Sequence, residues 1–192
     1  MGRPKQFDPD VAVDKAMDVF WRKGYAGTTP QDLVDELGIG KGSLYATFGS
    51  KRALFGRALQ RYREQQGDTL TRIIDQPGPV KSRLRAALML IVEANAADLD
   101  RRGCLAVNTA AELAGADPKA TRDVRQMFER NQDAIEAVIT EGQRAGEIRS
   151  DIPAPALAAH MLTTGIGLQL LAKTVRNPLD LTQVVDAAIG SL

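Results

Sequence analysis

Apolar residues recur along most of this chain with the 3.6-residue period of an α-helix, and few stretches alternate with the two-residue period of a strand. Glycine and proline interrupt this pattern, and they set the expected ends of the helices. The pattern therefore predicts an all-α protein of about nine helices. The expected ranges are 9–24, 30–38, 40–49, 50–75, 80–99, 103–114, 118–146, 153–175 and 177–190.

Residues 28–51 read as two short helices joined by a glycine turn. Thr29 is placed to cap the first helix, Pro30 suits the first helical position, and Asp32 completes a capping-box pattern. Gly38 can take the left-handed conformation that ends a helix. Two helices of about two turns each with a glycine turn between them are the helix-turn-helix arrangement, in which the second helix enters the major groove of DNA.

Eight spaced residues in and beside this segment also carry a family resemblance: Thr29, Val34, Gly38, Gly42, Tyr45, Phe48, Lys51 and Leu54. They resemble the signature of the tetracycline-repressor (TetR) family of bacterial transcription regulators. The signature covers roughly the first third of the chain, and the remainder matches only in its succession of helices. The resemblance implies a helix-turn-helix DNA-binding domain over residues 1–50 and a helical effector-binding and dimerisation domain over residues 51–192.

DNA contacts are expected from the N-terminal half of the second helix and from the residues beside it. The candidates for base edges are Lys41, Ser43 and Thr47, and the candidates for phosphate are Thr28, Thr29, Tyr45 and Lys51. The family often has His at the position of Thr47, so a contact made by that imidazole would here come from a shorter hydroxyl. The alternative for Tyr45 is a half-buried packing residue, and for Lys51 a solvated charge.

The N-terminal arm is basic, and its Gly-Arg-Pro core resembles arms that lie in A·T-rich minor grooves. Arg3 and Lys5 are therefore further candidates for DNA contact, with a solvated basic tail as the alternative. The net charge of +1 conceals an asymmetry, because residues 1–63 carry 11 Lys/Arg against 7 Asp/Glu while the remainder carries 14 against 17. The positive charge is thus concentrated at the DNA end of the chain.

Composition limits the class of protein. The chain has 192 residues, 44% of them hydrophobic and 26% charged, which is typical of a soluble globular protein with one large or two small domains. No apolar run reaches the ~18 residues of a membrane span, and the start of the chain lacks a signal sequence, so a cytoplasmic protein without a membrane partner is expected. A single cysteine excludes an internal disulfide and fits a reducing compartment.

Catalytic and cofactor sites are not expected. His160 and Cys104 are the only residues of their types, and neither has a local partner that would form a metal site or a catalytic triad. The glycine-rich stretch 38–43 is not a nucleotide-binding P-loop, because Asp35 stands where the first glycine is needed and Gly42 follows the lysine. We therefore expect no metal, no cofactor and no enzyme activity.

A small-molecule site is expected among the helices between residues 80 and 145. Three asparagines lie on or beside apolar stripes there, and converging amides in an apolar bundle can orient a ligand; equally, they can bond one another or cap carbonyls. The expected effector residues are Leu88, Val92, Asn95, Cys104, Asn108, Met127, Phe128 and Asn131. Cys104 follows two arginines at an expected helix start, which favours a reactive thiolate, although a lone cysteine more often acts as a small buried hydrophobe.

The helix expected over 153–175 is apolar on most sides, so something must bury it. The resemblance assigns the last two helices, 153–190, to a four-helix dimer interface; burial within one chain is the alternative. The expected interface residues are Leu157, Met161, Gly165, Leu168 and Leu171. A two-fold dimer would present two reading helices to a palindromic operator with half-sites ~34 Å apart or a multiple of that.

Taken together, these features predict a homodimeric repressor that binds a double-stranded DNA operator. An apolar or amphipathic effector would release it by shifting the long helix that starts at Ser50. Two alternatives remain at this point. One is a helix-turn-helix activator or architectural protein without a ligand, and the other is an enzyme built on a helical bundle.

Overall fold

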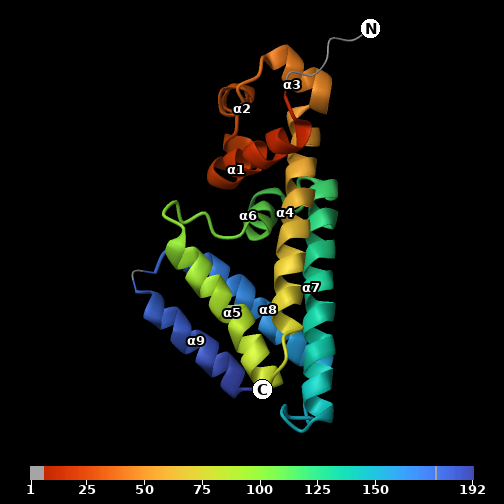
Figure 1. The fold of residues 1–192 in the computed structure, drawn as a ribbon, viewed down its shortest axis with the longest axis vertical. Coiled ribbons are helices and arrows are strands. Elements are labelled where there is room, and N and C mark those ends of the chain that lie inside the picture. Colours follow the sequence, from red (N-terminus) through yellow and green to blue (C-terminus); the bar gives the residue numbers. More distant parts are fainter. Residues whose placement is uncertain (1–6, 176) are drawn as a thin grey trace.

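The computed structural model describes residues 7–175 and 177–192, and within them the chain forms nine helices and no strand (Figure 1). The helices are α1 (Pro9–Gly27), α2 (Pro30–Leu37), α3 (Lys41–Phe48), α4 (Lys51–Ile74), α5 (Val80–Ala97), α6 (Leu105–Leu113), α7 (Pro118–Arg144), α8 (Ala154–Leu171) and α9 (Pro178–Gly190). The all-α prediction is confirmed, and each expected range overlaps one helix. The expected N-terminal arm, including Arg3 and Lys5, lies outside the described residues.

Local capping explains why the helix ends were predictable. Thr29 accepts a hydrogen bond from the backbone N–H of Asp32 at 3.1 Å, and the Asp32 carboxylate accepts one from the Thr29 N–H at 2.8 Å, which completes the predicted capping box. Gly38 ends α2 in the left-handed conformation, with φ of 65°. In contrast, α1 continues past its expected end at Gly24, where φ of 72° and ψ of 173° produce a kink.

Buried apolar side chains form two separate cores. The first core joins α1, α2, α3 and α6 to the beginnings of α4 and α7, and its largest buried side chains include Phe20, Phe55 and Tyr62. The second joins α5, α8 and α9 to the far ends of α4 and α7, around residues such as Leu84 and Ile139. Only α4 and α7, among the described helices, contribute buried residues to both cores. The division after residue 50 remains a prediction.

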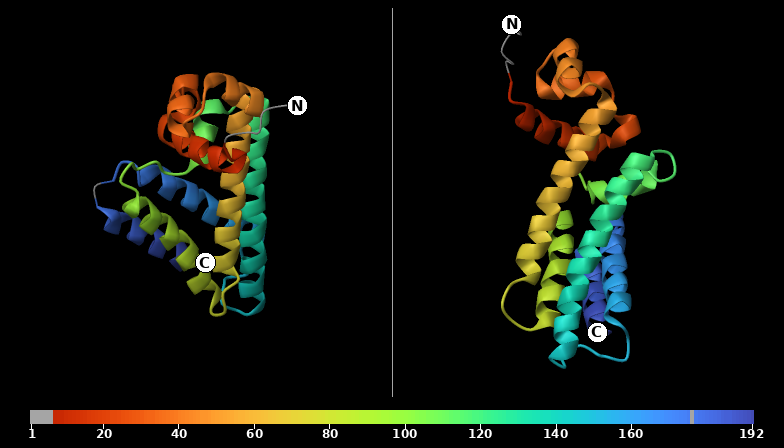
Figure 2. Two further views of the ribbon diagram at one scale, coloured as in Figure 1. Left: turned by 45° about the horizontal axis from the view of Figure 1, so that its top comes forward. Right: turned by 90° about the vertical axis from the view of Figure 1, so that its right-hand side faces the viewer.

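Helices α4 and α7 pack side by side along the length of the molecule (Figures 1 and 2). Three contacts fix their relative position: Arg52 with Asp117, Arg63 with Gln126, and Gly67 with Arg130. The partners in these contacts are 65, 63 and 63 residues apart in the sequence. The two helices are therefore parallel, and residues separated by about that number lie at the same level.

The structure corrects the expected subunit contacts of α8. Leu157, Met161, Gly165 and Leu168 are buried inside the chain, where α8 packs against α5 and α7, and only Leu171 is exposed, at 47%. Because α8 is apolar nearly all round, the sequence did not distinguish its inward face from its outward face. The length and hydropathy of Ala154–Leu171 also suffice for a membrane span, a test that core helices of soluble proteins pass as well.

Candidate functional site

The second helix of the helix-turn-helix has a buried side and an exposed side. Leu44 and Phe48 of α3 are buried in the first core beside Leu33 of α2. Lys41 and Ser43, at the N-terminal end of α3, are exposed, whereas Tyr45 and Thr47 are half-buried. The exposed end is the part of a reading helix that meets base edges in a helix-turn-helix. Lys41, Ser43 and Thr47 stay predicted base contacts, and Tyr45 stays a predicted phosphate contact.

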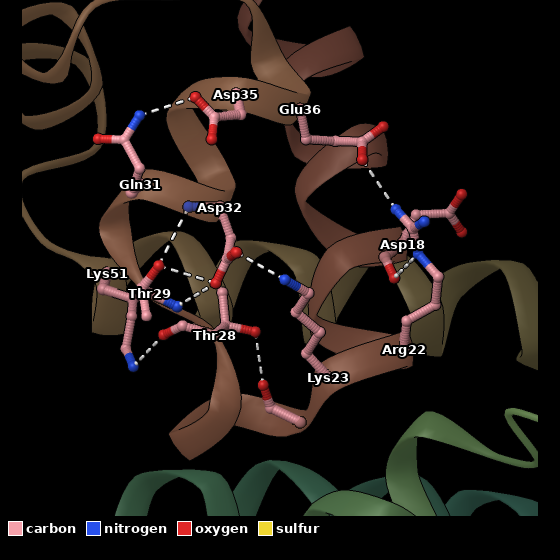
Figure 3. Close-up of polar contacts among 11 residues, drawn as sticks. Asp18, Arg22, Lys23, Thr28, Thr29, Gln31, Asp32, Asp35, Glu36 and Lys51 are labelled. Atoms are coloured by element: carbon pink, nitrogen blue, oxygen red, sulfur yellow. Dashed lines mark hydrogen bonds and ion pairs between the residues drawn. The ribbon is translucent and has the colours of Figure 1, made fainter.

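Ion pairs hold α2 against α1 (Figure 3). Arg22 contacts Glu36 at 2.8 Å, and Lys23 contacts Asp32 at 2.5 Å. The hydrogen bond from Lys23, together with those from Thr29, holds the pKa of Asp32 far below its ordinary value of 3.8. Two of the three carboxylates of α2 are thus paired with α1, which fixes the helix that supports α3, while the third, Asp35, accepts a hydrogen bond from Gln31 within α2.

Lys51 ties the start of α4 to the end of α1. Its ammonium donates a hydrogen bond to the backbone carbonyl of Thr28 at 2.8 Å (Figure 3). It also donates to the Tyr25 carbonyl at 2.8 Å and lies 4.3 Å from the centre of the Tyr25 ring. Carbonyls at the end of a helix lack intrahelical partners and attract a cation. Lys51 is therefore bound within the domain, which excludes the simple solvated charge that was the alternative interpretation.

The expected phosphate contact of the Thr28 side chain is wrong. Thr28 is 1% exposed, and its hydroxyl donates a hydrogen bond to the Gly24 carbonyl at 2.6 Å (Figure 3). The side chain fills the kink of α1, an arrangement that depends on the unexpected extension of that helix past Gly24. Thr29 is exposed, but its hydroxyl is bonded to Asp32 in the capping box.

A cavity of about 130 Å³ lies between the two cores, bordered by α4, α5, α7 and α8 and by the beginning of α6. Five of the expected effector residues line it: Leu88, Cys104, Met127, Phe128 and Asn131. Sequence reasoning missed its α4 and α8 walls, which include Gln66, Leu70, Met161 and Gln169. The apolar faces of those helices were visible in the sequence, but their convergence with α7 was not.

Three expected effector residues do not line this cavity. Val92 and Asn95 border a different hollow at the end of α5. The Asn95 amide donates to the Ile91 carbonyl at 2.8 Å and to the Gln169 side chain at 3.0 Å. Asn108 donates to the Arg102 carbonyl at 2.8 Å and accepts from Lys173 at 3.1 Å. For these two asparagines the alternative interpretation, internal hydrogen bonding, is correct.

Cys104 connects the cavity to the first core. It is 7% exposed, borders the cavity, and accepts a hydrogen bond from the Tyr62 hydroxyl at 3.2 Å. Burial raises the pKa of the Tyr62 phenol well above its ordinary value of 10.0, so the hydroxyl keeps the proton that it donates. The thiol is thus a packed, hydrogen-bonded part of the cavity wall.

The segment before α6 holds α1 from the side of the cavity. The Trp21 indole N–H donates to the Gly103 carbonyl at 3.0 Å, and the Arg102 guanidinium lies 4.4 Å from the centre of the Trp21 ring. Arg102 also contacts Asp18 of α1 at 2.8 Å. Because Gly103 is followed directly by Cys104, the cavity wall and α1 are attached to the same short segment.

Glu112, at the end of α6, makes a second attachment to α1. Its carboxylate accepts hydrogen bonds from the backbone N–H groups of Tyr25 at 2.9 Å and Ala26 at 2.6 Å. A Cβ atom at Gly24 would lie 2.9 Å from this carboxylate, and the φ of 72° at Gly24 also favours glycine. The kink of α1 therefore forms a small anion-binding turn that is filled from α6.

Comparison with known proteins agrees with this architecture. The sequence profile described as "Bacterial regulatory proteins, tetR family" matches residues 12–58, and "Tetracyclin repressor-like, C-terminal domain" matches residues 80–188. The HTH-type transcriptional regulator YezE of Bacillus subtilis (strain 168) is 31% identical over 193 aligned residues, which cover 100% of each chain. The chain belongs to the TetR family of transcriptional regulators.

Other relatives of this TetR-family chain are named as repressors. The HTH-type transcriptional repressor DhaR of Mycobacterium sp. (strain GP1) is 32% identical, covering 93% of this chain and 91% of its own. A solved cysteine mutant of the TetR-family regulator CifR, complexed with 26-base-pair double-strand operator DNA, has a TM-score of 0.86 at 31% identity and covers 99% of each chain. The family consists of DNA-binding regulators and not of enzymes. Among the described residues of this member, no group of three His, Cys, Asp or Glu side chains is placed to hold a metal ion.

Proposed function

We propose that this TetR-family chain is a homodimeric transcriptional repressor of the bacterial cytoplasm, released from a palindromic operator by a small molecule. The observation that carries the proposal is the attachment of one short segment, residues 102–112, both to the wall of the cavity and to α1. The repressor DhaR and the operator complex of CifR support the DNA-binding part of the proposal.

The proposed dimer uses the outward face of α8 together with α9. Leu170 is 57% exposed, Leu171 47% and Val184 41%, which places three of the exposed large apolar side chains on these two helices. Exposed apolar area of this kind commonly marks an interface. Two copies of this face, related by a two-fold axis, would form a four-helix interface. The α3 helix of each copy could then enter one of two successive major grooves of the operator.

The proposed release begins at the cavity. An effector that enlarges the cavity displaces Cys104 or Val107. The neighbouring Gly103 carbonyl, which binds Trp21, and the Glu112 carboxylate, which binds the Ala26 N–H, move with them. The movement reaches the reading helices through α1 as well as through α4. A coupling of ~1 to 3 kcal/mol between the two sites would weaken operator affinity roughly 5- to 150-fold, provided that the effector prefers the form that does not bind DNA.

Footprinting of the full-length protein on the DNA that flanks its own gene tests the proposal. We expect a protected palindrome with half-sites ~34 Å apart or a multiple of that. A footprint without two-fold symmetry would contradict the dimer. Fluorescence anisotropy on the footprinted site then tests release, because an effector that saturates the cavity without changing operator affinity would contradict the regulatory part.

A further inference from the structure

Most polar groups that border the cavity are already paired within the protein. The Tyr62 hydroxyl donates to Cys104, and the Thr69 hydroxyl donates to the Gln65 carbonyl at 2.9 Å. The oxygen of the Gln169 side chain accepts a hydrogen bond from Asn95, outside the cavity. Two side chains differ from these, because the amides of Gln66 and Asn131 border the cavity and have no hydrogen-bond partner among the described residues.

Gln66 and Asn131 both line the cavity, within about one helical turn of each other along the axes of α4 and α7. Gln66 precedes Gly67 on α4, and Gly67 packs against Arg130, which precedes Asn131 on α7. The two amides are 65 residues apart, which is the separation of Arg52 and Asp117 across the same pair of parallel helices. One polar group on a ligand is therefore offered hydrogen-bond donors and acceptors from both helices.

The described lining of the cavity contains no Asp, Glu, Lys, Arg or His. The cavity is partly open to solvent, so an ionised group held inside it would lose part of its hydration without gaining a counter-ion. Most of the lining residues are apolar, chiefly leucine, isoleucine, methionine and phenylalanine, and such walls favour apolar ligand surface. Charge and wall chemistry together select an uncharged ligand with one polar end.

The volume sets the size of that ligand. About 130 Å³ is open inside the cavity. A dry apolar cavity of ~150 Å³ in another protein binds benzene. A single ring with one small substituent, or a branched chain of similar bulk, therefore fills the cavity and presses on its walls.

We propose that the cavity binds a small, uncharged, largely apolar molecule of about one ring, whose single hydrogen-bonding group lies between the amides of Gln66 and Asn131. The inference rests on the proposed function only in taking this cavity as the effector site. It adds the charge, the size and the polar anchor of the effector, none of which follows from membership of the family.

Calorimetric titration of the full-length protein with three probes of matched size tests the charge and size. The probes are benzamide, benzoate and benzylammonium, all at pH 7. We expect benzamide to bind at least about tenfold more tightly than either ion, since each factor of ten needs only ~1.4 kcal/mol of the desolvation cost. Equal binding of either ion, or no binding of benzamide up to millimolar concentration, would overturn the proposal.

Methionine methyl resonances locate the probe. Met127 and Met161 line the cavity, whereas Met17 is buried in the first core away from it. Benzamide should shift the methyl signals of Met127 and Met161 and leave that of Met17 unchanged. A shift confined to other methionines would place the probe elsewhere and overturn the assignment.

The polar anchor is tested with Asn131→Leu and Gln66→Leu, which remove one amide each at similar volume. Each variant should weaken benzamide binding roughly 2- to 12-fold, the range expected for loss of one hydrogen bond. Toluene, which lacks the polar group, should bind each variant at least as well as it binds the wild type. Unchanged benzamide affinity in both variants would refute the anchor. Operator affinity measured in the same solutions separates the two proposals, because benzamide bound in the cavity without DNA release contradicts the proposed regulation alone.

Discussion

Lys51 provides a direct test of how the DNA-binding half is held together. In Lys51→Met the stem is retained while the ammonium is lost, and with it the two 2.8 Å hydrogen bonds to the carbonyls of Tyr25 and Thr28 and the contact with the Tyr25 ring. Hydrogen bonds to a charged group contribute about 1.5 to 3 kcal/mol each when well buried, and an exposed cation–π contact about 0.5 to 1 kcal/mol.

The Lys51 side chain is only half-buried, so solvent reduces these values. After this reduction by solvent, we expect the three interactions together to contribute about 2 kcal/mol to the free energy of unfolding. For a chain of this length, 1 kcal/mol corresponds to roughly 2 to 4 °C in Tm, so Lys51→Met should melt about 4 to 8 °C lower than the wild type. Thermal unfolding followed by circular dichroism measures the difference.

Lys41→Met is the matched control, because Lys41 is exposed on α3 and makes no hydrogen bond or ion pair among the described residues. It should retain the wild-type Tm and lose operator affinity. A Tm for Lys51→Met within 1 °C of the wild type, or an equal loss in Lys41→Met, would refute the stabilising role of Lys51. The salt dependence of operator binding is a separate measurement, since a lost phosphate contact reduces its slope by ~0.9 whatever happens to stability.

Three further predictions concern other contacts. Asp117→Asn keeps the α7 cap but loses the pair with Arg52, which holds the pKa of Asp117 at about 2, below its ordinary 3.8. That stabilisation is complete above pH 4 and disappears as the pH falls through 2, so urea midpoints of variant and wild type should differ at pH 7 and converge near pH 2. In Glu112→Ala, the effector should change operator affinity much less than it does in the wild type, while operator affinity without effector should stay the same. Fluorescence anisotropy measures both affinities. Leu171→Glu should sediment as a monomer, and a persistent dimer would contradict the proposed interface.

Local sequence signals predicted the helix-turn-helix well. The capping box of Thr29 and Asp32 and the left-handed Gly38 involve residues at most a few positions apart, so their chemistry is legible in the sequence. The roles of Lys51 and Glu112 were not predictable, because each depends on backbone atoms that are 23 or more residues away in the sequence. Only the folded arrangement brings those groups together.

The cavity was predictable only in part, because some of its residues follow a local pattern and others depend on packing between helices. Met127, Phe128 and Asn131 follow the apolar stripe of α7, and the structure places all three at the cavity. Asn95 has the same kind of signal, but its amide bonds to its own helix and to α8. Periodicity identifies the inward stripe of a helix, whereas the partner of a polar group on that stripe is decided by packing between helices.

The position of the cavity between two cores has a consequence for the heat-capacity profile of the protein. Cores joined by α4 and α7 can unfold as separate cooperative units, in which case the calorimetric enthalpy exceeds the van't Hoff enthalpy. Met127 of one core and Leu88 of the other both line the cavity, so a molecule bound there would contact both. Its binding should therefore sharpen the transition as well as raise it, bringing the two enthalpies together and making the two halves one thermodynamic unit.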